Sequence, residues 1–195
     1  MEKEQAAAAV RAFLAALDVD VSARGMERTP ERVAEMFGYL FGGLGRDAAA
    51  VLGTPFETGA TGLVAVQRIP FSSLCEHHLV PFYGSMDLVY QPHAGRVAGF
   101  SRFVEAVDVL ARRPQLQERL TREVAETVMR GLAADGVLVV CRAHQFCMAL
   151  REGGTHDTLT TTSEALGALA EPAQAAQAWA LLGARGKRML EEETV

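Results

Sequence analysis

Apolar residues recur with helical spacing near the start of the chain. Val10, Phe13 and Leu14 mark one apolar face of this segment, as in an amphipathic helix that packs against a core. The spacing predicts a helix over residues 3–17. Residues 18–28 lack that periodicity and are expected to form a loop.

A second helix is predicted from Thr29, because threonine followed by proline is typical of a helix start. Thr29 would be the N-cap and Pro30 the first helical residue. The helix is expected to run to about Phe41, where a cluster of glycines ends it. Residues 45–62 are rich in glycine and threonine, so we expect irregular structure there.

From Leu63 onward the pattern changes to short β-like segments and further helical ones. Strands are expected over Leu63–Phe71, Gly84–Tyr90, Val137–Leu150 and Thr158–Thr162. Helices are expected over residues 99–112, 115–133 (after a break at Pro114) and Pro172–Leu182. The chain has no internal repeat and no linker, which predicts a single α+β domain. Its expected parts are an N-terminal helical extension (1–62), a core (63–170), and a C-terminal helix with a tail (171–195).

Composition and charge narrow the class of protein. The 195 residues are 49% hydrophobic and 22% charged, which is typical of a globular domain. The formal net charge of -5 predicts no broad basic surface, so nucleic acid is not expected as a partner. No apolar run is long enough for a membrane span, and the acidic, amphipathic N-terminus is unlike a signal peptide. We therefore expect a cytoplasmic protein.

The sharpest local motif is Cys75-x-x-His78, in a loop expected over Ser72–Pro81. A thiolate and an imidazole at this spacing can face one ion, and both ligand types suit zinc. A chain with three cysteines does not make a disulfide framework. The other candidate soft ligands are His77, His93, Cys141, His144, Cys147 and His156. Cys141 lies in an apolar run and is interpreted as a core residue, and a buried cysteine beside surface histidines is the alternative interpretation of the motif itself.

Several longer strings occur in order along residues 25–167. They are TPERV from Thr29, CEHHLVPFYG from Cys75, GFSRF from Gly99, QLQERLT from Gln115, CM from Cys147 with Arg151, and TTTS from Thr160. Taken together, these strings are similar to those of the GTP cyclohydrolase I family, and there are too many of them for a chance match.

The resemblance implies a tunnelling fold, in which an antiparallel sheet carries two helices on one face. It also implies a ring-shaped homodecamer with active sites between subunits. Cys75, His78 and Cys147 would bind Zn²⁺ and leave a fourth position for water, which would attack C8 of a guanine nucleotide. In the family the imidazole ring opens, formate leaves, and the ribose rearranges to give dihydroneopterin triphosphate.

The same resemblance assigns a substrate pocket. Glu118 matches the residue that binds the guanine edge, where a carboxylate accepts from adjacent N–H groups, and Gln117 lies beside it. His77 matches a histidine that transfers protons or binds the ribose. The expected ribose and triphosphate contacts are Ser101, Arg102, Arg32 and Arg151. Each of these arginines, taken alone, is more commonly a solvated surface charge.

The chain departs from the family next to Cys147. The family has a catalytic acid–base histidine two residues before this cysteine, whereas this chain has Gln145 there and His144 one residue earlier. On a regular strand Gln145 and Cys147 share a face, so we expect Gln145 in the site unless a β-bulge turns His144 inward. Glutamine does not exchange protons near neutral pH, and losing such a group costs about 10²–10⁴-fold in rate.

Two further positions that are cationic in the family are Glu35 and Glu105 here. Near a triphosphate these carboxylates would repel, unless neighbouring loops supply replacement cations. Three hypotheses follow. The chain is an ordinary GTP cyclohydrolase I, or a divergent member that stops at ring opening or uses a less phosphorylated guanine compound, or a catalytically silent ring that binds zinc and a purine.

Overall fold

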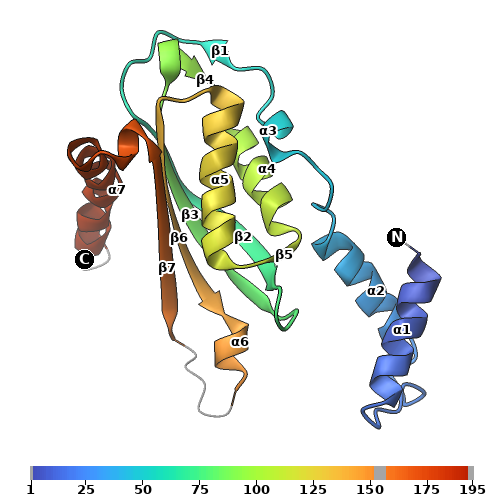
Figure 1. Cartoon of the computed structure of the whole chain (residues 1–195). Helices are drawn as coiled ribbons and strands as arrows, with labels where there is room; N and C mark the ends of the chain where they lie inside the picture. Colours follow the sequence, from blue (N-terminus) through green and yellow to red (C-terminus); the bar gives the residue numbers. More distant parts are fainter. Residues whose placement is uncertain (1, 152–156, 193–195) are drawn as a thin grey trace.

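A five-stranded sheet forms the centre of the molecule (Figure 1). The computed structural model describes residues 2–151 and 157–192. The sheet strands are β2 (Val64–Cys75), β3 (Pro81–Gln91), β5 (Pro114–Gln115), β6 (Gly136–Gln145) and β7 (Leu159–Gly167). They lie in the order β5-β2-β3-β6-β7. Neighbouring strands are antiparallel except for β5, which pairs with the end of β2 in parallel.

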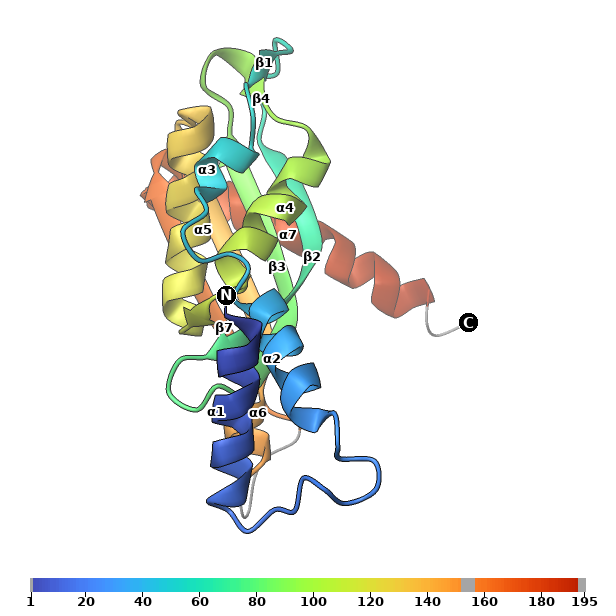
Figure 2. The ribbon, with the colours of Figure 1, turned by 90° about the vertical axis from the view of Figure 1, so that its right-hand side faces the viewer.

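Helices cover the two faces of the sheet unequally. One face carries α4 (Phe100–Ala111) and α5 (Gln117–Leu132), and the other is partly covered by the start of α7 (Pro172–Glu192) (Figures 1 and 2). The apolar sides of α4 and α5 bury a core against β2, β3 and β6. Val137–Cys141 of β6 are buried on both faces, which explains why this strand reads as a continuous apolar run.

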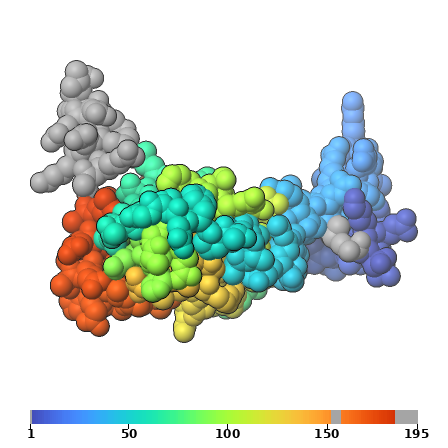
Figure 3. Space-filling model, turned by 90° about the horizontal axis from the view of Figure 1, so that it is seen from above, coloured from blue at the N-terminus to red at the C-terminus, as the bar shows by residue number. Residues whose placement is uncertain are grey.

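The N-terminal helices form a lobe beside the sheet. Helix α1 (Lys3–Ala15) packs on α2 (Thr29–Leu40), and Figures 1 and 3 show the pair at one end of the molecule. The lobe joins the rest of the chain where the Arg112 guanidinium lies 3.9 Å from the centre of the Tyr39 ring and donates to its hydroxyl. Phe13 and Met36 of the lobe are 64% and 62% exposed, so part of its apolar surface is left uncovered by the described chain.

The remaining short elements complete the chain. They are α3 (Ala48–Val51), β1 (Phe56–Glu57), η1 (His93–Gly95), β4 (Arg96–Val97), α6 (Phe146–Ala149) and η2 (Ala168–Ala170). The α+β class, the mainly antiparallel sheet and the two helices on one face agree with the sequence prediction. Within the described residues, no helix combines the length and apolar character needed to cross a membrane.

Several local expectations were wrong. Thr29 is the first helical residue rather than the N-cap, and Arg28 precedes it without a side-chain cap. Residues 45–62 are not wholly irregular, because they contain α3 and β1. The expected loop Ser72–Pro81 is much shorter, since β2 continues to Cys75 and β3 begins at Pro81. Pro114 does more than separate two helices, because it starts the short strand β5.

The most consequential error concerns the strand expected over Val137–Leu150. Strand β6 ends at Gln145, and Phe146–Ala149 form the single helical turn α6. Cys147 therefore lies on a helical turn, where the strand rule of alternating faces does not apply. Its side chain is placed by the turn rather than by the strand.

Candidate metal centre and pocket

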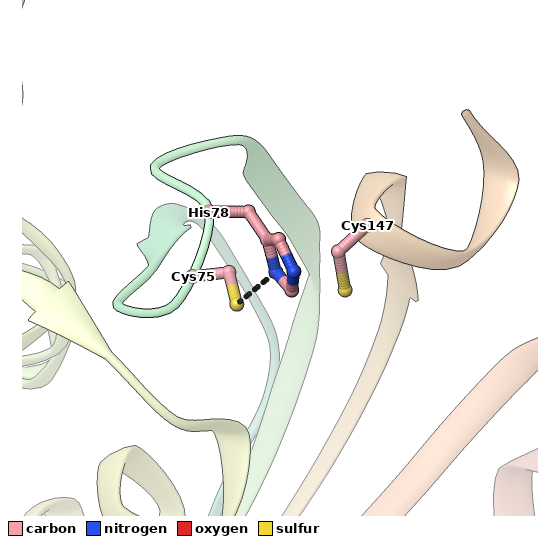
Figure 4. Close-up of side chains that lie close together, drawn as sticks. All are labelled: Cys75, His78 and Cys147. Atoms are coloured by element: carbon pink, nitrogen blue, oxygen red, sulfur yellow. Dashed lines mark hydrogen bonds between the residues drawn. The ribbon is translucent and has the colours of Figure 1, made fainter. Parts of the chain in front are cut away.

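Three soft side chains from two distant segments meet at the end of the sheet. Cys75 ends β2, His78 lies in the loop to β3, and Cys147 lies on α6. One possible ligand atom from each lies within 4.8 Å of the other two, and Cys75 Sγ is 3.8 Å from His78 Nδ1 (Figure 4). Among the described residues, no other group of histidine, cysteine or carboxylate side chains converges in this way.

Backbone hydrogen bonds shape the loop that carries His78. The Cys75 N–H donates to the Val80 carbonyl at 2.9 Å, and the Leu79 N–H donates back to the Cys75 carbonyl at 2.8 Å. Leu79 takes a positive φ of 52°, a conformation that leucine rarely adopts. The loop therefore holds a tight turn that brings the imidazole of residue 78 back over the sulfur of residue 75.

The three side chains fit a zinc ion. Two sulfurs and one imidazole are the ligand types that zinc prefers, and three protein ligands leave a fourth position open, as in catalytic sites. Burial and the neighbouring Cys75 thiol raise the pKa of Cys147, because two thiolates side by side repel each other without a cation. By contrast, burial raises the pKa of Cys141 to about 12, which suits a core thiol.

A pocket of about 460 Å³ opens beside this group. We call the segment from Cys75 to Val80, between β2 and β3, the metal loop. The pocket lining comes from the metal loop, the start of β3, the segment from β5 to the start of α5, the β6–α6 junction and strand β7: Cys75, His77, Phe82, Gln115, Leu116, Gln117, Glu118, Gln145, Cys147, Met148, Thr160, Thr161 and Thr162. The pocket therefore brings His77, Gln117, Glu118 and Gln145 together with two of the three candidate metal ligands.

Gln117 is buried in the pocket wall, and both the nitrogen and the oxygen of its side-chain amide form hydrogen bonds. Its Nε2 donates to the carbonyl oxygens of Cys141 and Thr160, both at 3.2 Å. Because a carbonyl oxygen cannot donate, these two contacts fix which end of the amide is nitrogen. Its Oε1 accepts from the Thr160 hydroxyl at 2.6 Å and from Gln145 Nε2 at 2.7 Å.

The Gln117 amide in turn orients Gln145. Since Gln117 presents an oxygen, Gln145 must present its nitrogen to it, which turns the Gln145 carbonyl oxygen away from this contact. His144 pairs opposite Tyr83 in the strand register, with the two ring centres 5.7 Å apart, and does not line the pocket. The β3–β6 register runs without a bulge through Gln145, so the structure does not contain the bulge that would turn His144 inward.

The residues expected to bind phosphate lie apart from this pocket. Ser101, Arg102 and Arg32 are exposed and are not among the lining residues. Arg102 donates to Glu105 at 3.0 Å. Arg151 lies against a candidate metal ligand instead, with Nη2 2.9 Å from His78 Nε2.

The two unexpected carboxylates are paired with cations. Glu105 lies 3.8 Å from Arg46 as well as contacting Arg102, and Glu35 lies 4.0 Å from Lys3. All of these side chains are largely exposed, so their ion pairs are screened by solvent.

The remaining candidate soft ligands lie elsewhere or are not described. His93 Nδ1 contacts Asp135 at 2.7 Å, and Cys141 is fully buried in the core. His156 lies outside the described residues. Sequence reasoning gave no role to the threonines of β7, although the alternation of that strand places Thr160 and Thr162 on the face toward α5.

The fold and the site define a class of protein, one in which three candidate metal ligands converge beside a pocket that carries histidine, glutamine, glutamate and threonine side chains. Comparisons with known proteins then identify the family. The family model described as GTP cyclohydrolase I matches residues 6–182. A protein named GTP cyclohydrolase 1 from Lysinibacillus sphaericus is 47% identical over 163 residues, covering 84% of this chain and 86% of that protein.

Two further relatives bear the same name. The one from Bacillus subtilis is 41% identical and covers 90% of this chain and 92% of its own length. The one from Carboxydothermus hydrogenoformans is 41% identical and covers 94% and 96%. The chain therefore belongs to the GTP cyclohydrolase I family, and the resemblance seen in the sequence is confirmed.

Proposed function

We propose that this chain is a zinc-dependent hydrolase that carries out the GTP cyclohydrolase I reaction. It opens the imidazole ring of GTP at C8, releases formate and forms dihydroneopterin triphosphate. The observation that carries this proposal is the position of Glu118 in the same pocket as Cys75 and Cys147. Family membership supports the same conclusion.

The metal and the recognition groups have separate tasks. Cys75, His78 and Cys147 would hold Zn²⁺, which at such a site acts as a Lewis acid and activates water for attack on carbon. Glu118 is exposed in the pocket, and its carboxylate would accept hydrogen bonds from the guanine edge. His77 also lines the pocket and is the titratable side chain proposed to hand protons to the substrate.

Gln145 is proposed to take the place of the family's acid–base histidine. Its nitrogen is engaged by Gln117, so its carbonyl oxygen is free to accept a hydrogen bond from substrate or water. This position can orient a ligand but cannot exchange a proton. The observation favours a second candidate function, in which the reaction stops after ring opening or proceeds slowly beyond it.

The ring-shaped homodecamer is proposed on the placement of the cationic residues. Arg32 and Arg102 lie outside the pocket of their own chain, and the lobe of α1 and α2 exposes apolar side chains. A neighbouring subunit that covers this apolar surface would bring such residues to a shared pocket. Three free thiols also suit a reducing compartment, which supports the cytoplasm as the proposed location.

The test is to incubate zinc-loaded protein with GTP, GMP, guanosine and guanine while following formate release and pterin fluorescence. Equal formation of formate and fluorescent pterin from GTP is expected for the complete reaction. Formate, or a formamide product, without fluorescence would favour the divergent hydrolase. Tight guanine binding with neither product would show a silent ring and contradict the proposal. Size-exclusion chromatography with light scattering measures the assembly.

A further inference from the structure

An ion pair connects the metal loop to the helix that carries the guanine-binding carboxylate. The Arg119 Nη2 atom donates to Glu76 Oε2, and neither residue has a role in the function proposed above. Glu76 stands between Cys75 and His77 in the loop, whereas Arg119 follows Glu118 in the first turn of α5. The pair therefore bridges the two sides of the pocket.

Arg119 is held in place by more than this contact. Its Nε donates to Gln115 Oε1 at 2.9 Å, and its Nη2 also donates to the Pro114 carbonyl at 3.2 Å. Gln115 is fully buried and its amide nitrogen donates to the Leu110 carbonyl and to Glu123. Strand β5 thus holds the Arg119 guanidinium in the position from which it contacts Glu76 of the metal loop.

Glu76 is tied to the same strand through its backbone. Its N–H donates to the Gln115 carbonyl at 3.0 Å, where β5 pairs with the end of β2. The side chains of Glu76 and Arg119 are 30% and 39% exposed, so this contact is better shielded from water than the other arginine pair on α5. In that pair, Arg122 and Glu126 are 66% and 48% exposed.

We propose that Glu76 and Arg119 are positioning residues that hold the metal loop at a fixed distance and angle from Glu118. The inference rests on the proposed function, because it assigns these residues to the geometry of that site. Neither side chain lines the pocket, so neither touches the substrate. They act through Cys75 and His77 on one side and Glu118 on the other. Partners around a metal site change affinity or activity by about 10–100-fold when removed, and small misplacements of a reacting group have similar effects.

The experiment compares wild-type protein with Arg119→Gln, Arg119→Lys, Glu76→Gln, the double variant Arg119→Gln/Glu76→Gln, and the matched control Arg122→Gln. Two quantities are measured in each: the rate at which a chromogenic chelator extracts zinc in the absence of GTP, and the separate kcat and KM with GTP. Visible spectra of the cobalt-loaded proteins report the ligand geometry. Thermal unfolding shows whether each variant is folded.

Arg119→Gln is expected to release zinc about tenfold faster and to lower kcat about 10–100-fold, with KM changed less. Glu76→Gln should behave alike, and the double variant should be no worse than the more severe single one. Arg119→Lys should recover only part of the loss, because an ammonium cannot reproduce the three contacts of the fork. Arg122→Gln should match the wild type, and the cobalt spectrum should change in the Arg119 and Glu76 variants alone.

The inference is overturned if folded Arg119→Gln matches Arg122→Gln in zinc release and cobalt spectrum, or if the two single losses multiply in the double variant. These outcomes differ from a failure of the proposed function. Wild-type protein that binds no zinc or cobalt would defeat the metal centre, and wild-type protein that binds zinc but leaves GTP unchanged would defeat the reaction alone.

Discussion

The metal side and the phosphate side of the proposed site are built in different ways. The three candidate metal ligands converge within one chain, from the end of β2 and from a helical turn after β6. The residues expected to bind ribose and triphosphate remain scattered over α2, α4 and the segment that follows α6. Cys75 and Cys147 of the first group line the same pocket as Glu118, whereas none of the expected ribose and triphosphate contacts lines it.

The difference teaches that the residues proposed for bond-making chemistry and those proposed for anion binding have separate structural sources. The metal group depends on backbone turns that the fold of one chain fixes, such as the positive φ of Leu79. Arg32 and Arg102 lie exposed on α2 and α4, and Arg102 forms an ion pair with Glu105. We therefore propose that a single chain supplies the reacting centre and that assembly supplies the phosphate contacts.

The largest expected effect comes from the metal side. Replacing Cys147 by alanine removes one of three ligands, and a metal ion contributes several kcal/mol to transition-state stabilisation. We therefore expect zinc content to fall and kcat/KM for GTP to drop by about 10³-fold or more. Metal analysis and steady-state kinetics measure both, with Cys141→Ala as the matched cysteine control. Unchanged turnover in metal-free Cys147→Ala protein would refute the metal centre.

The next effect concerns Glu118, which lines the pocket beside the candidate metal ligands. Glu118→Gln replaces a charged acceptor by a neutral amide, so kcat/KM for GTP should fall about 10²-fold while zinc content stays unchanged. Glu126→Gln, on the exposed side of the same helix, is the control. A loss of zinc in Glu118→Gln would mean that the carboxylate stabilises the metal loop rather than binding the guanine base.

A third prediction concerns Gln145. A histidine there could still donate to Gln117 Oε1 while its second nitrogen faces the pocket, which restores a group that titrates near pH 6.5. We expect Gln145→His to raise the rate of pterin formation about tenfold and to add a pH dependence near neutrality. The His144→Gln variant should change neither, because residue 144 lies against Tyr83. Slower pterin formation in Gln145→His would show that the amide itself is needed.

The smallest effect belongs to the phosphate side. Glu105→Gln frees Arg102 and Arg46 from a carboxylate, so KM for GTP should fall by up to about fivefold, and less at high salt. Glu35→Gln frees Lys3 in the N-terminal lobe and makes the matched comparison. Titrations of GTP at two ionic strengths measure the change. A rise in KM in the Glu105 variant would show that its ion pairs hold the arginines in a useful position.

Sequence reasoning predicted the α+β class, which the structure confirms, and it singled out three side chains that the structure brings together. Apolar periodicity located the long helices and strands, since their buried faces repeat along the chain. The Cys75-x-x-His78 motif is local, so spacing alone brought its two side chains together. Cys147 required the family resemblance, because nothing in the sequence between the two segments shows that β2 and α6 meet.

Other features depended on contacts that no local pattern contains. Two backbone carbonyls, on β6 and β7, fix the orientation of the Gln117 amide, and Gln117 in turn fixes the orientation of the Gln145 amide. These groups are far apart in the sequence. The end of β6 was missed because Phe146-Cys147-Met148 is as apolar as the strand before it. Strand β5 is only two residues long, and its pairing with β2 comes from tertiary packing rather than propensity.

The junction between β6 and α6 has a consequence for how such a protein can vary. Strand β6 forms ten residue pairs with β3 and nine with β7. A residue inserted within the strand would turn the side chains of all later strand residues to the opposite face of the sheet. In the described part of the chain, the helical turn after Gln145 forms no strand pairing on either side. The junction can therefore accept a change of one residue in length without disturbing the strand. Such a change replaces the side chain that enters the pocket at position 145 but leaves the following cysteine, Cys147, in the site.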